Sequence, residues 1–219
     1  MRTLKYIVVQ LCVLLLLASC DTKQDWVDTG VSSPYHDCSM MEYLRGDKYN
    51  WELTVQMIER GGLTDMFEGK EAGYEKITFF AIPSYSILRY LWDNDLETVN
   101  DLTSEFCRTT ILNHVVKGKY LKADIAYRNM DYLITDEKQD GGTSLTTEGG
   151  RKLKAYVDKT SYGGVPDVGA EIMYLHSFSA QTQVPLATPD IQPLNGVVHA
   201  LNYNFVLGKI YVLSNEIRD

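Results

Sequence analysis

The cysteines and histidines are the side chains of this sequence best suited to nucleophilic or metal chemistry, and their spacing argues against both. Cys107 and His114 are seven residues apart. On one helix that spacing is a rise of about 10.5 Å, too far for a thiolate–imidazole pair. His36 and Cys38 offer two ligands where a zinc site needs three or four. We therefore expect no metal and no catalytic cysteine.

Other catalytic and cofactor patterns are missing from the sequence. It contains no Gly-x-Ser-x-Gly, Walker or dinucleotide-binding motif. Asp93, Asp95 and Glu97 resemble the start of a calcium loop, but Thr98 stands where the sharp turn needs glycine. The acidic run is interpreted as a solvated surface. The prediction is a non-enzymatic protein with no cofactor.

The tripeptide Arg45-Gly46-Asp47 could be bound by an adhesion receptor. Arg45-Gly46-Asp47 is the sequence that some host receptors bind, and its glycine permits a tight exposed turn with a charge on each side. An ordinary turn between two helices is the alternative interpretation.

Three tyrosines are candidates for contact with sugars, because an aromatic ring combines an apolar face with a polar edge. They lie in the irregular middle of the chain, where we expect exposure: Tyr120, Tyr127 and Tyr132. Trp51 instead has helical spacing with Val55 and Ile58 and is expected in the core.

The first twenty residues have the pattern of an export signal. Arg2 and Lys5 precede an apolar run that ends in Leu17-Ala18-Ser19-Cys20. A helix over that run would span about 20 Å, less than the ~30 Å hydrocarbon core. The last four residues resemble the lipobox of bacterial lipoproteins, in which the cysteine is lipidated and becomes the first residue of the mature protein. The resemblance implies an anchor at Cys20; an ordinary cleaved signal is the alternative.

The remaining chain divides into a tether and one domain. Residues 1–19 are predicted to be the lipoprotein signal peptide, 20–34 a polar lipidated tether, and 35–219 a single domain. The whole chain has a net charge of −8, and both basic residues of the signal would be removed, so the mature surface is more acidic still. That charge argues against nucleic-acid binding. Cys38 and Cys107 could form a disulfide or remain two buried thiols.

Helical patterns dominate the first half of the domain. Asn50 is a candidate N-cap, Gly61-Gly62 a stop, and Ser84 a second N-cap. The expected helices are Cys38–Leu44, Trp51–Arg60, Tyr85–Trp92 and Phe106–Val116, with one buried strand at Ile77–Ile82 that ends at Pro83.

Strand patterns dominate the second half. Lys152–Asp158 alternates, with Leu153, Ala155 and Val157 on the buried face and Tyr156 on the exposed one. Further strands are expected at Ile172–Phe178, Val197–Leu201 and Ile210–Leu213. Helices that lead and strands that follow indicate an α+β fold.

Four segments, in order, resemble blocks of the fasciclin (FAS1) domain. Ile77–Leu88 (I-T-F-F-A-I-P-S-Y-S-I-L) resembles its first strand-to-helix block, and Ile111–Tyr120 (I-L-N-H-V-V-K-G-K-Y) its L-x-x-H-V-V-x-G-x-Y block. Ser144–Leu153 resembles the T-x-x-G-x-x-L segment, and Asn195–Leu201 (N-G-V-V-H-A-L) the N-G-V-V-H-V-I-D block. Asn202 stands where the family usually has aspartate.

The resemblance implies a β-sandwich or wedge of about seven strands with helices packed alongside. It implies that His114 orders the core by hydrogen bonds, and we expect the same structural role for His199. Asn195-Gly196 is expected to form a turn with positive φ that leads into a strand. These residues are candidates for framework roles.

The family resemblance also implies a non-enzymatic interaction or adhesion domain, which a lipid at Cys20 would hold at the cell envelope, in the outer membrane or on the cell surface. Its partner would be a protein, a matrix or a polysaccharide. The alternative is an accessory glycan-binding or nutrient-uptake lipoprotein beside an outer-membrane transporter. A hydrolase with an unrecognised site in Lys159–Pro193 is a third hypothesis.

Overall fold

The computed structural model describes residues 33–210 of the 219-residue chain. By its internal contacts the chain divides after Ser33, and Pro34 begins the second compact unit. The predicted signal peptide, Cys20 and nearly all of the predicted tether lie outside the described residues, as do the last three residues of the strand predicted at Ile210–Leu213.

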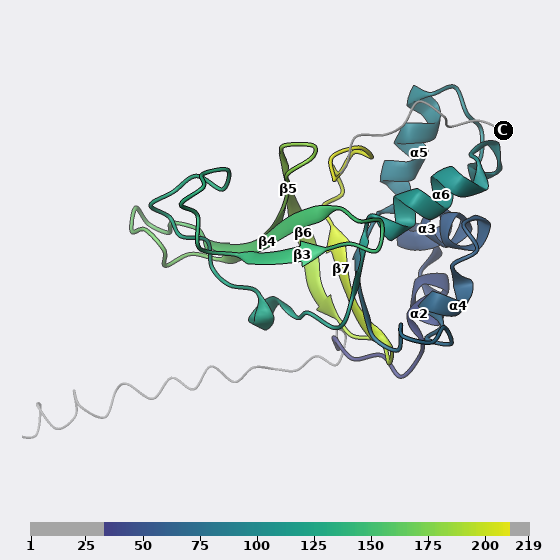
Figure 1. Ribbon diagram of the computed structural model, residues 1–219, viewed down its shortest axis with the longest axis horizontal. Coiled ribbons are helices and arrows are strands. Elements are labelled where there is room, and N and C mark those ends of the chain that lie inside the picture. Colours follow the sequence, from purple (N-terminus) through teal and green to yellow (C-terminus); the bar gives the residue numbers. More distant parts are fainter. Residues whose placement is uncertain (1–32, 211–219) are drawn as a thin grey trace, which may run out of the picture. The chain divides into compact units, whose positions relative to one another are not determined.

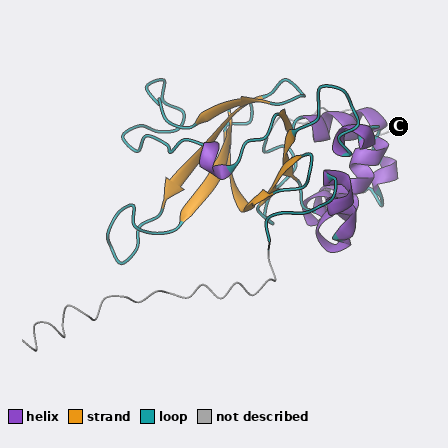
Figure 2. Cartoon of the chain, turned by 90° about the horizontal axis from the view of Figure 1, so that it is seen from below, coloured by secondary structure: helices purple, strands orange, loops and turns teal. Residues whose placement is uncertain are grey.

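Five α-helices of the described part lie together on one side of the strands (Figure 1). Figure 2 shows the same separation of helices from strands from a second direction. The helices are α2 (Met40–Gly46), α3 (Lys48–Arg60), α4 (Thr64–Phe67), α5 (Ser84–Asp93) and α6 (Ser104–Leu112), with short 3-10 turns η1 (Val99–Asp101) and η2 (Lys122–Asp124).

Seven strands of the described part form one nearly closed sheet in the order β2-β1-β7-β6-β5-β4-β3. Of the six pairs that these seven described strands form, only β1–β7 is parallel. The strands are β1 (Ile77–Ala81), β2 (Val115–Lys117), β3 (Thr143–Thr146), β4 (Lys152–Lys159), β5 (Glu171–Ser177), β6 (Thr182–Ile191) and β7 (Gly196–Leu201). The prediction of an α+β fold with about seven strands and helices alongside is confirmed.

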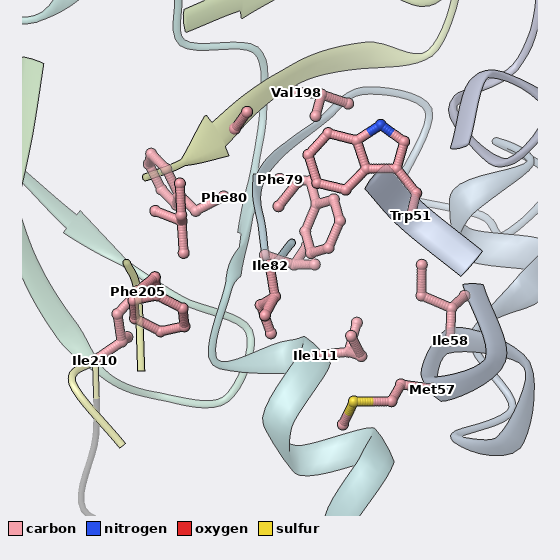
Figure 3. Packing of buried hydrophobic residues seen from close by; sticks show 14 of the residues in the cluster. Trp51, Met57, Ile58, Phe79, Phe80, Ile82, Ile111, Val198, Phe205 and Ile210 are labelled. Atoms are coloured by element: carbon pink, nitrogen blue, oxygen red, sulfur yellow. The ribbon is translucent and has the colours of Figure 1, made fainter. Parts of the chain in front are cut away.

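The core fills the space between the helices and strands β1 and β7 (Figure 3). The Trp51 ring of α3 lies beside Phe79 of β1 and Val198 of β7 (Figure 3). Ile58 of the same helix points into the space that Ile111 of α6 and Ile82 after β1 also line, and all these side chains are buried. Burying a large apolar side chain contributes about 1.5–3 kcal/mol. This burial makes the helical layer and β1 one packing unit.

The starts of two helices differ from the sequence-based expectation. The carboxylate of Asp47 accepts from the Asn50 N–H at 3.2 Å, so α3 begins at Lys48 and Asn50 lies inside it. Helix α5 has Pro83 at its N-cap and no side-chain cap. The Ser84 hydroxyl instead accepts from the Leu53 N–H of α3 at 3.1 Å, which joins the two helices.

The helix predicted at Phe106–Val116 ends earlier, at Leu112. It begins at Ser104 because the Thr103 hydroxyl accepts from the Phe106 N–H at 2.9 Å. After Leu112 the chain pairs with β1: the His114 carbonyl accepts from Phe80 N–H at 2.9 Å, and Val115 lies opposite Phe79. Strand pairing therefore overrides the helical pattern.

Three details of the second half also differ. Tyr156 is 1% exposed rather than solvent-facing, because its ring stacks on Tyr174 at 5.3 Å between centroids. Strand β6 lies within Lys159–Pro193, where no strand was predicted beyond Ile172–Phe178. Ile210 is buried but not in a strand.

Cys38 and Cys107 do not form a disulfide. Cys107 is fully buried and Cys38 half-buried, so the interpretation as two thiols holds, with Cys38 more accessible than expected.

Candidate functional site

The segments quoted for the family resemblance meet inside the molecule. Strand β1, from the first block, lies between β2 of the second block and β7 of the last. The Thr78 hydroxyl donates to the Gly118 carbonyl at 2.8 Å and accepts from the Tyr120 N–H at 2.9 Å. Because these groups are buried or backbone atoms, the blocks build a framework where they meet.

Asn195 links the start of β7 to two helices. Its Oδ1 accepts from the Met40 N–H of α2 at 2.6 Å, and its Nδ2 donates to the Phe67 carbonyl of α4 at 3.0 Å. The side chain is 7% exposed, so both backbone groups would be left unsatisfied without it. This double contact is a role that the turn pattern alone does not reveal.

Gly196 begins β7 at a position where no side chain fits. Its φ is +155°, and a Cβ atom there would lie 2.0 Å from the Ile77 carbonyl oxygen of β1. The expected positive φ is therefore present, and the close approach of the parallel strand is a second reason for glycine.

His199 joins β7 to two neighbouring segments. Its Nε2–H donates to the Tyr120 carbonyl at 2.8 Å, and its Nδ1 accepts from the Asp190 N–H at 3.1 Å. The ring stacks on Phe80 at 5.5 Å. These contacts fix the neutral form, and burial lowers the pKa of His199.

His114 is fully buried at the corner between α6 and β2. Its Nδ1–H donates to the Thr110 carbonyl at 2.7 Å, and its ring meets the edge of Phe205. Burial lowers the pKa of His114 to about 4, so the imidazole is neutral at pH 7. Buried among backbone and aromatic groups, both histidines have a geometry suited to structural support.

The Ser144–Leu153 segment forms the β3–β4 hairpin, whose turn rests on the same corner. Glu148 N–H donates to the Val115 carbonyl at 2.8 Å, and a Cβ atom at Gly149 would lie 2.1 Å from Asn113 Oδ1. The glycine is needed so that the hairpin can approach the helix end.

A hollow lies at the N-terminal ends of α3 and α5. It has a volume of about 410 Å³ and is lined by Tyr49, Tyr85 and Tyr203 together with Lys48, Glu52 and Leu53. Tyr49 is 86% exposed and Tyr203 52% exposed. The rings of Tyr85 and Tyr203 stack at 4.3 Å with only 10° between their planes. This is an aromatic surface open to a ligand.

The sequence was compared with known families and structures. The model of the fasciclin domain matches residues 50–206. The chain belongs to the fasciclin domain family. Fasciclin domains are generally non-enzymatic adhesion modules.

Among solved structures, the chain is similar to the FAS1 domain pair of the insect cell adhesion molecule fasciclin I, with a TM-score of 0.53 and 15% identity. The match covers 80% of this chain and 53% of that one, so the chain spans about half the length of the domain pair. At this identity the likeness shows the fold alone. No curated protein sequence matches the chain.

In this fasciclin domain Arg45-Gly46-Asp47 forms the corner between α2 and α3. The Arg45 guanidinium pairs with Glu59 at 2.8 Å and Glu68 at 3.4 Å, while Asp47 caps α3. Gly46 is the last residue of α2 and Asp47 joins it to α3, which agrees with the alternative interpretation of an ordinary corner between two helices. The two charged groups thus have structural partners, and receptor binding through this tripeptide stays a hypothesis.

The tyrosines chosen from the sequence differ in exposure. Tyr120 packs against the core and Tyr132 is half-buried, so the expected exposure is wrong for both. Tyr127 is 50% exposed, but its hydroxyl donates to Glu171 and Lys159 lies over its ring at 5.1 Å. Its ring face is therefore already covered. Tyr49, Tyr85 and Tyr203 were missed because their grouping depends on the fold.

Within residues 33–210, no group of three or more acidic, histidine or cysteine side chains could hold a metal ion. Across the same part of the chain, no helix is long and apolar enough to cross a membrane.

Proposed function

We propose that this chain is a bacterial lipoprotein whose fasciclin domain is held at the cell envelope by a lipid on Cys20 and there contacts a protein or matrix partner. The observation that carries the proposal is the fasciclin match over residues 50–206, because adhesion is the usual work of such domains. The Leu17-Ala18-Ser19-Cys20 pattern supports the anchor. Two or three acyl chains hold a protein on a bilayer firmly, because each buried methylene adds about 0.8 kcal/mol.

The geometry fits a module that acts by contact. His114, Asn195, Gly196 and His199 stabilise the interior, which leaves the surface free to vary with the partner. A tether of about fifteen residues would let the domain reach ~20 Å from the bilayer. We propose the outer membrane, with the domain at the surface, as the location.

Membrane partition and attachment test this proposal. Cells that produce Cys20→Ala are compared with wild type and with Cys38→Ala, which keeps the lipobox and loses a different thiol. We expect Cys20→Ala to leave the membrane fraction and to abolish the attachment of cells to matrix-coated surfaces, and Cys38→Ala to behave as wild type. Membrane retention of Cys20→Ala contradicts the anchor. Equal attachment of cells with and without the wild-type protein contradicts the adhesion function.

Glycan binding beside an outer-membrane transporter is a second candidate function. It is favoured by the hollow that Tyr49, Tyr85 and Tyr203 line, because tyrosine rings offer sugars both an apolar face and a hydroxyl group. Co-purification from membranes in mild detergent tests it: a transporter that remains bound to the wild-type protein supports this function, and its absence contradicts the transporter partnership.

A further inference from the structure

We propose that the depression around Tyr203 binds a linear, uncharged oligosaccharide across two adjoining sugar subsites. The proposal rests on the second candidate function and assigns it a site and a ligand class. It differs from the sequence-based hypothesis, which placed sugar contact at Tyr120, Tyr127 and Tyr132.

The depression consists of two adjoining hollows. Next to the 410 Å³ hollow lies a second one of about 250 Å³, and both are lined by Asn50, Pro83 and Tyr203. The shared residues make the two hollows neighbours, and Tyr203 belongs to the walls of both. Small-molecule sites usually have volumes of about 300–1,000 Å³, so the larger part suits a compact ligand and the pair suits a linear one.

Neighbouring side chains hold the tyrosine rings of the depression in place. Arg89 lies 5.5 Å from the centre of the Tyr85 ring and donates to the Phe205 carbonyl at 2.6 Å. Tyr85 in turn stacks on Tyr203. The stacked pair is therefore held in place before a ligand arrives, which lowers the entropic cost of binding. Tyr49, on the first turn of α3, lines the same hollow and is 86% exposed.

The larger hollow is bordered by charged and hydrogen-bonding side chains. Lys48, Asn50 and Glu52 line the larger hollow and are exposed, so donors and acceptors lie next to the aromatic rings. One positive and one negative side chain balance each other at this rim. An uncharged ligand with many hydroxyl groups matches this mixture, because hydroxyls both donate and accept. An anionic glycan would meet the like charges of Glu52 in the larger hollow and Asp47 in the smaller one, and a cationic glycan would meet that of Lys48.

The exposed ring of Tyr127 is a poorer surface for a sugar. Tyr127 is already engaged by Glu171 and Lys159, as described above. A sugar that stacked on Tyr127 would have to displace a cation from its ring. The Tyr49 and Tyr203 rings carry no such cation among the residues that the structure describes.

The experiment is titration calorimetry on the full chain in mild detergent. The probes are neutral gluco-, manno- and xylo-oligosaccharides of one to six units. We expect at least one series to bind, with affinity that rises as the ligand lengthens from one unit to several. Tyr49→Ala and Tyr203→Ala are each expected to weaken binding about tenfold, since one aromatic stacking contact contributes about 1 kcal/mol or more.

The matched control is Tyr162→Ala, which removes an equally exposed tyrosine (76%) from another part of the domain. It should leave binding unchanged. Because Tyr49 is almost fully exposed, its replacement does not disturb folding, so a loss in Tyr49→Ala reports on the ligand.

The remaining outcomes overturn the proposal in separable ways. Binding that both variants keep would move the site elsewhere and leave the second candidate function standing. No binding by any series would overturn both, without affecting the lipid-anchored adhesion function that Cys20→Ala tests. Binding of a proline-rich peptide at Tyr49 and Tyr203, with no sugar bound, would assign the depression to a protein partner.

Discussion

The buried imidazole of His114 should make stability depend on pH. Its folded pKa of about 4 lies below the ordinary value of 6.5, so between these limits the unfolded chain binds a proton that the folded chain does not. The stabilisation is complete above pH 6.5, falls by about 3 kcal/mol as the pH drops toward 4, and then levels off.

Urea unfolding at pH 7.5 and pH 4.5 measures this effect. We expect the loss of stability between these values to be smaller in His114→Gln than in wild type. It should not vanish, because burial lowers the pKa of His199 in the same direction. An identical loss in the variant would show that His114 is not the group that titrates.

Asn195 should tolerate no change that removes its donor. In Asn195→Asp a carboxylate oxygen would face the Phe67 carbonyl, while the contact with Met40 N–H could persist. We expect the free energy of unfolding to fall by about 2–3 kcal/mol. The exposed Asn204→Asp is the control, expected within about 0.5 kcal/mol of wild type. Equal effects of the two substitutions in chemical denaturation would contradict the double contact.

Asp47 allows the receptor hypothesis to be tested apart from the helix corner. Asparagine caps a helix about as well as aspartate, so Asp47→Asn should keep the thermal stability of the domain. It removes the negative charge that a receptor for Arg45-Gly46-Asp47 would need. Because both charged side chains already have partners, we expect the attachment of host cells to be unchanged. Lost attachment at unchanged stability would instead establish receptor binding.

At the scale of elements, the β1–β7 pair depends on one glycine. In Gly196→Ala the new methyl group would meet the Ile77 carbonyl, so the parallel strands must separate. We expect a loss of more than about 3 kcal/mol, or failure to fold. Gly150→Ala is the matched control, since its φ of +76° is strained but its Cβ meets open space. A cost near 1 kcal/mol for both, measured by urea unfolding, would contradict the steric role.

Patterns of the sequence predicted the elements better than their ends. The apolar run of β1 and the alternation of β4 are visible because burial acts on each strand separately. Strand β6 is hidden by Pro185, Pro189 and its polar residues, and two register shifts interrupt its pairing with β7. Helix starts at Lys48 and Ser84 were misplaced because Asp47 caps α3 and because the Ser84 hydroxyl accepts from the Leu53 N–H of α3 and does not cap α5.

The candidate binding surface could not be predicted for a related reason. Tyr49, Tyr85 and Tyr203 come from three distant segments, and only the packing of α3 on α5 and the turn after β7 brings them together. The framework residues could be predicted because the family resemblance marks them. Asn202, which departs from the family pattern, still accepts from the Asn204 N–H at 3.0 Å, so the turn after β7 is kept.

At the scale of the whole molecule, the proposed function places a contact module on a membrane. The described residues form a fasciclin fold whose family-like blocks meet at β1, β2 and β7, and an acidic chain with a net charge of −8 is a poor candidate for nucleic acid. A domain that works by contact can bind only partners within reach of the place where it is anchored. Under the proposed function, a lipid on Cys20 would decide where the domain can meet a partner, whether protein or glycan.

Intact-mass analysis of the protein extracted from the membranes of its own cells tests this claim most directly. The account predicts a chain that starts at Cys20 and carries the mass of covalently attached fatty acyl groups. A chain that starts elsewhere, or an unmodified Cys20, would contradict it.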